Sequence, residues 1–188
     1  MKKSAFVALA AFLFLAVSAV TARAADDVAG PPMPMVGQDA PPFTLPSQDG
    51  TAVSLKSFHG KWVVLYFYPR DMTTGCTIEA HKFQDSLKDF GAKHAVILGV
   101  SVDSTDSHKQ FCTKDSLTFR LLADTDHTVV SAYGSLASHN GVYMANRNTF
   151  LINPKGKVVK EWTKVNPTDS ASEVLAVLPN KGSTIKAD

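Results

Sequence analysis

The sequence has few cysteines and little net charge. Its 188 residues include two cysteines, and 19 Lys and Arg side chains stand against 17 Asp and Glu, a formal net charge of +2. No cluster of Lys and Arg interleaved with aromatic residues follows the first 24 residues, so nucleic-acid binding has no support. No internal repeat or low-complexity segment interrupts the chain, and one domain is expected.

Motifs for metals and phosphate-bearing cofactors are also missing. No two histidines are three to five residues apart, and no glycine-rich phosphate loop is present. The aspartates around Ser104 lack the glycine and terminal glutamate of a calcium loop, so helix capping explains them. We therefore expect no bound metal, no cofactor and surface positions for the histidines. These are His59, His81, His94, His108, His127 and His139.

The N-terminus has the pattern of a secretory signal peptide. Residues 1–3 are a short basic start, residues 5–20 are almost wholly apolar, and residues 22–24 place small side chains at the cleavage spacing. A membrane anchor is the alternative, but the apolar run is shorter than the roughly 20 residues that a spanning helix needs. We expect cleavage after Ala24, a periplasmic protein and no stable membrane insertion after cleavage.

The remainder is predicted to form one domain at 39–180. Residues 25–38, rich in Gly, Pro and Met, are typical of a flexible leader, and residues 181–188 of a loose tail. Apolar and β-branched runs predict two hairpins and two buried strands, and helical spacing predicts three helices. Strands alternating with helices indicate an α/β fold with a parallel core. The hairpins are 43–55 and 149–163, the buried strands 63–68 and 95–101, and the helices 76–90, one carrying Cys112, and 170–178.

One cysteine follows directly on the first buried strand. Pro69 cannot donate to a sheet ladder, so it ends the strand, and Gly75 precedes the helical pattern that starts at Cys76. In a helix's first turn, unpaired N–H groups and the positive end of the helix dipole favour a thiolate over a thiol. Cys76 is therefore a candidate nucleophile. The alternative is a buried structural cysteine.

The residues around Cys76 resemble the peroxiredoxins. Pro69, Thr73 and Cys76 match the family's Pro-x-x-x-Thr-x-x-Cys motif, and the flanking Tyr-Phe-Tyr-Pro and Gly-Cys-Thr-x-Glu-Ala are similar to the Q-type branch, also called bacterioferritin comigratory proteins. Residues 39–43, 133–134 and 147–152 extend the resemblance over roughly residues 36–178. It implies a thioredoxin-like fold, with a central mixed β-sheet flanked by helices and an N-terminal β-hairpin.

The resemblance also implies roles for individual residues. Cys76 would be the peroxidatic cysteine, which attacks the peroxide and becomes a sulfenic acid. Pro69 would shield the thiolate, the Thr73 hydroxyl would bond the peroxide, and Arg147 would hold the thiolate and the polarised oxygens. Glu79 would have a supporting role, because in the family a glutamate at this position orients the arginine. Alternatively, Arg147 is a surface arginine before a strand.

The second cysteine, Cys112, lies 112 − 76 = 36 residues downstream on a predicted helix capped by Ser104 or Thr105. Many Q-type members carry the resolving cysteine five residues after the first, where this chain has His81; others carry it on the next helix, as here. By resemblance Cys112 resolves the sulfenic acid as an intramolecular disulfide. On composition alone, an exported protein with two cysteines more often holds a structural disulfide.

The function implied is a thiol peroxidase reducing hydrogen peroxide and organic hydroperoxides, recycled by a thioredoxin-like dithiol protein. A monomer is expected. A thioredoxin-like disulfide reductase would need Cys-x-x-Cys, and Glu79 occupies the second position. Two alternatives remain: a non-enzymatic binding or holdase domain with a structural disulfide, and a one-cysteine peroxidase in which Cys112 is structural.

Overall fold

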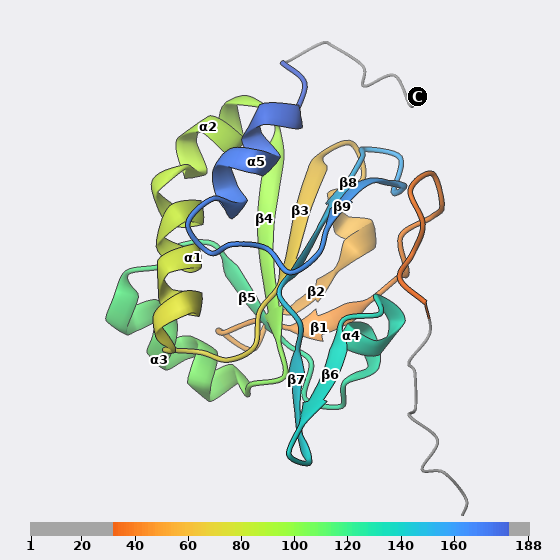
Figure 1. Ribbon diagram of the computed structural model, residues 1–188. Coiled ribbons are helices and arrows are strands. Elements are labelled where there is room, and N and C mark those ends of the chain that lie inside the picture. Colours follow the sequence, from red (N-terminus) through yellow and green to blue (C-terminus); the bar gives the residue numbers. More distant parts are fainter. Residues whose placement is uncertain (1–31, 181–188) are drawn as a thin grey trace, which may run out of the picture.

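The computed structural model describes residues 32–180, and Figure 1 shows a central sheet with helices packed on it. Five strands pair in the order β5-β4-β3-β8-β9, and two-stranded sheets form from β1-β2 and β6-β7. The strands are β1 (Thr44–Pro46), β2 (Ala52–Ser54), β3 (Trp62–Phe67), β4 (Ala95–Ser101), β5 (Arg120–Ala123), β6 (Leu136–His139), β7 (Val142–Ala145), β8 (Asn148–Ile152) and β9 (Val158–Trp162). The helices are η1 (Leu55–Phe58), α1 (Thr74–Asp85), α2 (Leu87–Ala92), α3 (Thr105–Asp115), α4 (Thr128–Ala132) and α5 (Ser170–Val177).

Strand β3 lies at the centre of the sheet and explains its mixed character. It runs parallel to β4 and antiparallel to β8, so the predicted mixed sheet is confirmed. Its last five residues are buried, as expected for a run of β-branched and aromatic residues between two neighbours. Alternate side chains enter opposite faces: Leu65 and Phe67 pack in one apolar cluster, Val64 and Tyr66 in the other.

The two faces of the sheet are covered differently. One cluster includes side chains from the β1-β2 hairpin and α4. The other is formed with α1, α2, α3 and α5, which lie together on the left in Figure 1. Both candidate cysteines belong to this second cluster, Cys76 from α1 and Cys112 from α3. The sheet order therefore brings the two cysteine-bearing helices to the same face.

Some elements differ from those expected. The predicted helix 76–90 is two helices, because Ser86 has φ −94° and ψ 3° and separates α1 from α2. The sequence analysis did not identify β5, α4, or the hairpin β6-β7, each only four or five residues long. Such short segments carry too few turns or alternations for a periodic signal.

Part of the predicted leader is packed against the domain. The amide of Gly37 donates to the Val158 carbonyl at 2.7 Å, and the amide of Val158 donates to the Gln38 carbonyl at 2.9 Å. Met33 packs on Gly134, where a Cβ would lie 2.6 Å from Met33 Cγ, so only glycine fits. The predicted signal peptide and the tail at 181–188 lie outside the described residues. Within residues 32–180, no helix has the length and apolar character to span a membrane.

Candidate active site

Cys76 lies in the first turn of α1, as the sequence predicts, although the helix begins at Thr74 rather than at Cys76. The chain leaves β3 and passes Pro69, and Thr73 takes the extended conformation (φ −85°, ψ 151°) that precedes a helix. The first helical hydrogen bond runs from the Thr77 amide to the Thr73 carbonyl at 2.8 Å, so Cys76 lies in the turn whose own N–H groups have no intrahelical acceptor. The cysteine is 2% exposed. Its surroundings therefore combine low solvent access with the positive end of a helix.

Arg147 contacts Cys76 although the two residues are 71 positions apart in the sequence. It stands between β7 and β8, and its Nη2 donates to Cys76 Sγ at 3.3 Å. Strand pairing brings Arg147 to Cys76: Asn148 pairs with Phe67, so Arg147 lies at the end of β3, just before the loop that leads to Cys76. A Cβ on Gly75 would lie 3.3 Å from the same Nη2, and glycine leaves the guanidinium room.

Glu79 holds the second arm of the guanidinium. Its side chain is fully buried on α1, one turn after Cys76, and Oε2 accepts from Arg147 Nη1. Burial raises the pKa of Glu79 to about 7, although the charge and hydrogen bond of Arg147 act in the opposite direction. Burial lowers the pKa of Arg147, but the charges of Glu79 and Cys76 outweigh it and raise that pKa. Arg147 is therefore a fixed cation between a thiol and a carboxyl group.

The other two predicted site residues lie beside this arrangement. Thr73 is exposed at the N-cap of α1, and its Oγ1 donates to the Arg70 carbonyl at 3.1 Å rather than to Cys76. Pro69 is half-buried. The Thr73 hydroxyl retains its acceptor lone pairs, and its rotation offers a donor to a molecule that enters the site. The structure thus groups Cys76, Glu79 and Arg147 by direct contact, with Thr73 and Pro69 on the adjoining loop.

Cys112 has a different environment. It lies late in α3, whose N-cap Ser104 accepts from the Ser107 amide at 3.2 Å, in line with the capping expected there. Cys112 is half-buried, and both cysteines are free. Burial, and secondarily the negative charge of Asp71, raise the pKa of the Cys112 thiol to about 11. Cys112 is therefore protonated at neutral pH in this conformation.

The sequence analysis missed a buried polar cluster beside Cys112. His108, expected at the surface, is fully buried, and its Nδ1 contacts Asp71 Oδ2 at 2.8 Å. The surface expectation was wrong because the carboxyl of Asp71 pairs with the imidazole inside the fold. One signal was available: His108 and Cys112 are four residues apart on a helix, and such residues share a face.

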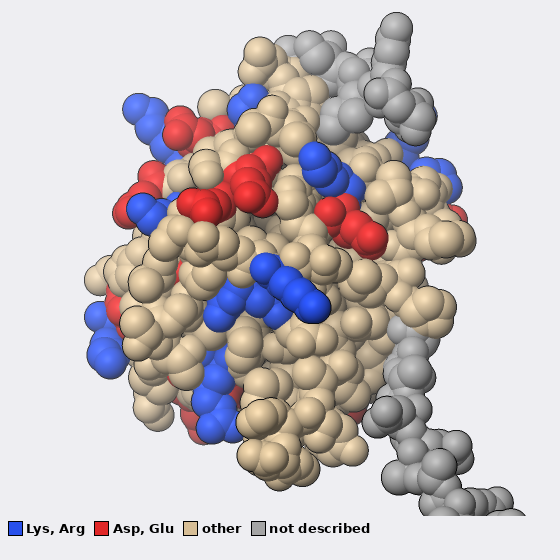
Figure 2. Space-filling model, viewed as in Figure 1, with Lys and Arg blue, Asp and Glu red and all other residues tan. Residues whose placement is uncertain are grey.

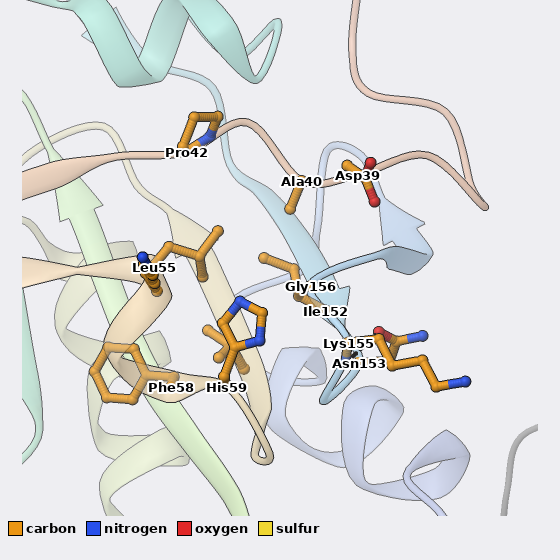
Figure 3. Close-up of a pocket in the computed structure, with 12 residues that line it drawn as sticks. Asp39, Ala40, Pro42, Leu55, Phe58, His59, Ile152, Asn153, Lys155 and Gly156 are labelled. Carbon is orange, nitrogen blue, oxygen red and sulfur yellow. Dashed lines mark hydrogen bonds between the residues drawn. The ribbon is translucent and has the colours of Figure 1, made fainter.

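A cavity of about 340 Å³ lies away from these residues. Figure 3 shows Leu55, Phe58 and His59 on one side of it and Ile152, Asn153 and Lys155 on the other. Its walls reach β3 at Val63, the beginning of the strand, whereas Cys76 follows the strand's end. The cavity contains none of the predicted site residues, and the reactive groups are held by loop and helix contacts instead.

Comparison with known proteins identifies the family of this chain. The family model described as the AhpC/TSA family matches residues 36–161. The peroxiredoxin Bcp of Bacillus subtilis is 44% identical over 147 residues, which is 76% of this chain and 94% of the relative. This chain belongs to the AhpC/TSA family. Within that family its relatives are the Bcp and Q-type peroxiredoxins.

Solved structures of the family share the fold. The peroxidoxin BcpB of Mycobacterium tuberculosis matches with a TM-score of 0.73 and 32% identity, over 77% of this chain and 96% of that one. A bacterioferritin comigratory protein of Xanthomonas campestris, studied for alkyl peroxide reduction, matches with a TM-score of 0.69 and 39% identity. The match covers 72% of this chain and 89% of that one. Other structures of peroxiredoxin Q from that organism each have one cysteine replaced by serine, at two positions 36 residues apart.

Proposed function

We propose that this protein is a thiol-dependent peroxidase that reduces hydrogen peroxide and organic hydroperoxides at Cys76. The observation that carries the proposal is the contact between Arg147 Nη2 and Cys76 Sγ at 3.3 Å, at the N-terminal turn of α1. The thiolate attacks one oxygen of the O–O bond and forms a sulfenic acid. The bond breaks with its electron pair on the other oxygen, which takes a proton and leaves as water or an alcohol.

Arg147 suits this step because charge moves onto the departing oxygen. The guanidinium stays protonated, has further N–H groups beyond those on Cys76 and Glu79, and lies where the oxygen develops charge. Glu79 fixes its orientation through Nη1. The Thr73 hydroxyl bonds the incoming peroxide, and Pro69 keeps water from the thiolate. Figure 2 shows a mostly uncharged face, with Lys and Arg grouped near its centre and Asp and Glu mainly above them.

Cys112 resolves the sulfenic acid. Its sulfur attacks the Cys76 sulfur, a disulfide forms, and the hydroxyl of the sulfenic acid leaves with the thiol proton as water. Two observations support this role: Cys112 packs on the same apolar cluster as Cys76, and the spacing of 112 − 76 = 36 residues equals that of the cysteines replaced in the Xanthomonas structures. A thioredoxin-like dithiol protein then reduces the disulfide.

The substitution Cys112→Ser tests the resolving role. The variant should complete the first oxidation at the native rate and then stall, over-oxidise or cross-link through Cys76, as measured by stopped-flow kinetics and intact mass. Steady turnover of the variant with a dithiol protein would favour the one-cysteine peroxidase. Absence of peroxide consumption by the native protein would favour the non-enzymatic binding domain.

The protein works as a monomer in the periplasm after removal of residues 1–24. The basic start, apolar run and small residues of that segment support export. N-terminal sequencing of the periplasmic protein should begin at Ala25, and size-exclusion chromatography with light scattering should give one chain. Full-length protein in the membrane fraction would instead identify an anchor.

A further inference from the structure

The carboxylate of Asp71 is a buried hydrogen-bond acceptor for three side chains. Its side chain is 1% exposed. Oδ1 accepts from the Tyr68 hydroxyl at 2.7 Å, and Oδ2 accepts from the Ser107 hydroxyl at 2.7 Å and from His108 Nδ1 at 2.8 Å. Because a carboxylate oxygen is the acceptor in this contact, His108 Nδ1 is assigned as the donor. His108 Nε2 is buried without a partner among the described residues.

These bonds join two segments that the peroxidase reaction uses. Asp71 belongs to the loop between β3 and α1, which ends at the Thr73 cap and delivers Cys76. Ser107 and His108 belong to the first turns of α3, which carries Cys112. A backbone bond adds to the connection, from the Asp71 amide to Asp103 Oδ2 at 2.9 Å just before α3.

We propose that the side chains of Asp71, Ser107 and His108 are a latch that holds α3 closed and thereby sets the rate at which Cys112 resolves the sulfenic acid. The inference rests on the proposed function and adds a control to its second step. With the latch closed, Cys112 is kept in the apolar cluster and beside a negative charge. Opening frees the N-terminal turns of α3, and Cys112 moves to the Cys76 sulfur, with a disulfide and water as products.

The latch acts on the second step alone. Asp71 does not contact Cys76 or Arg147 through any hydrogen bond among the described residues, and Ser107 and His108 belong to another helix. Weakening the latch should therefore leave sulfenic acid formation unchanged and speed its conversion to disulfide. Because over-oxidation competes with resolution, a weaker latch also protects the enzyme at high peroxide concentration. These three residues are positioning residues, since none touches the peroxide.

Ser107→Ala is the sharpest test, because it removes one bond to the carboxylate and leaves the active-site loop intact. Loss of a hydrogen bond to a buried charge should speed disulfide formation roughly tenfold. Ser107→Thr keeps the hydroxyl and should restore the native rate. Thr113→Ala is the matched control: its hydroxyl donates within α3 to the Lys109 carbonyl at 2.8 Å, and its removal raises helix propensity as Ser107→Ala does.

Rapid-mixing kinetics with hydrogen peroxide separate the two steps, and hydrogen exchange of the reduced protein reports opening of residues 105–112 without any peroxide. We expect an unchanged first step, a faster second step and faster exchange in Ser107→Ala, with native values in Ser107→Thr and Thr113→Ala. An unchanged or slower second step in Ser107→Ala, while the disulfide still forms, would overturn the latch and leave the peroxidase standing. A native protein that forms no Cys76–Cys112 disulfide would overturn the resolving role and the latch together.

Discussion

The two cysteines pack in the same apolar cluster, yet charges of opposite sign act on them. Cys76 is fully buried in the first turn of α1 and accepts from the guanidinium of Arg147. Cys112 is half-buried late in α3, and the charge that acts on it is the Asp71 carboxylate, which with burial raises its pKa to about 11. A cation stabilises a thiolate and an anion disfavours one. The cation therefore lies beside the proposed nucleophile, and the carboxylate acts on the proposed resolving thiol.

The largest expected effect comes from replacing each of the two cysteines by serine in a separate variant. Cys76→Ser should abolish peroxide consumption, because serine at this position is not a nucleophile toward an O–O bond. Cys112→Ser is the matched control and should retain the first oxidation. Peroxide loss with and without a dithiol donor measures both. If both variants lost the first oxidation equally, the assignment of Cys76 as the peroxidatic cysteine and Cys112 as the resolving cysteine would be wrong.

Removing the cation beside Cys76 should slow the first step roughly 100-fold, as for other donors that stabilise developing negative charge. The substitution is Arg147→Ala, and stopped-flow oxidation by hydrogen peroxide measures it. Arg120→Ala, at an exposed position at the start of β5, is the control and should react at the native rate. A native rate in Arg147→Ala would show that the helix terminus alone activates Cys76.

Titration of Glu79, which lies beside Cys76, should make the free energy of unfolding depend on pH. Its pKa is about 7 in the folded protein against an ordinary 4.5, so between these values the folded state binds more protons than the unfolded state. Its contribution to the free energy of unfolding should therefore fall by ~2 kcal/mol as pH rises from about 5 to 6.5.

The substitution Glu79→Gln should remove that dependence, because the amide does not titrate. Urea unfolding at several pH values compares the variant with the native protein. The exposed Glu173, at the start of α5, provides the control Glu173→Gln, which should keep the native slope. If Glu79→Gln kept the native pH dependence of the free energy of unfolding, a group other than Glu79 would be responsible for it.

The smallest expected effect is on the thiol of Cys112. Asp71→Asn should lower its pKa from about 11 toward the ordinary 9.0, because the substitution weakens the latch that keeps Cys112 buried and removes the negative charge. The pH dependence of alkylation, measured in a Cys76→Ser background, reports this value. Asp106→Asn changes an exposed acid on the same helix and should leave the profile unchanged.

Much of the fold could be predicted from local signals. The runs of β-branched and apolar residues predicted β3 and β4, the break at Pro69 preceded α1, and the capping residues Ser104 and Thr105 predicted α3. Short elements such as α4 and the β6-β7 hairpin could not be predicted, because their stability comes from packing against the sheet rather than from periodicity. The buried His108 was missed for a similar reason, since its partner Asp71 is 37 residues away.

The sequence by itself indicated which chemistry this protein carries, through a strand that ends at Pro69, a cysteine in the first turn of the next helix, and the resemblance of Pro69, Thr73 and Cys76 to the peroxiredoxin motif. These features are local, and short-range propensities suffice to produce them. Only the tertiary structure decided what surrounds each sulfur. Arg147 reaches Cys76 across 71 residues because β8 pairs with β3, and Asp71 meets His108 because β4 brings α3 beside the active-site loop. Charges act through distance in space, and sequence separation does not fix that distance.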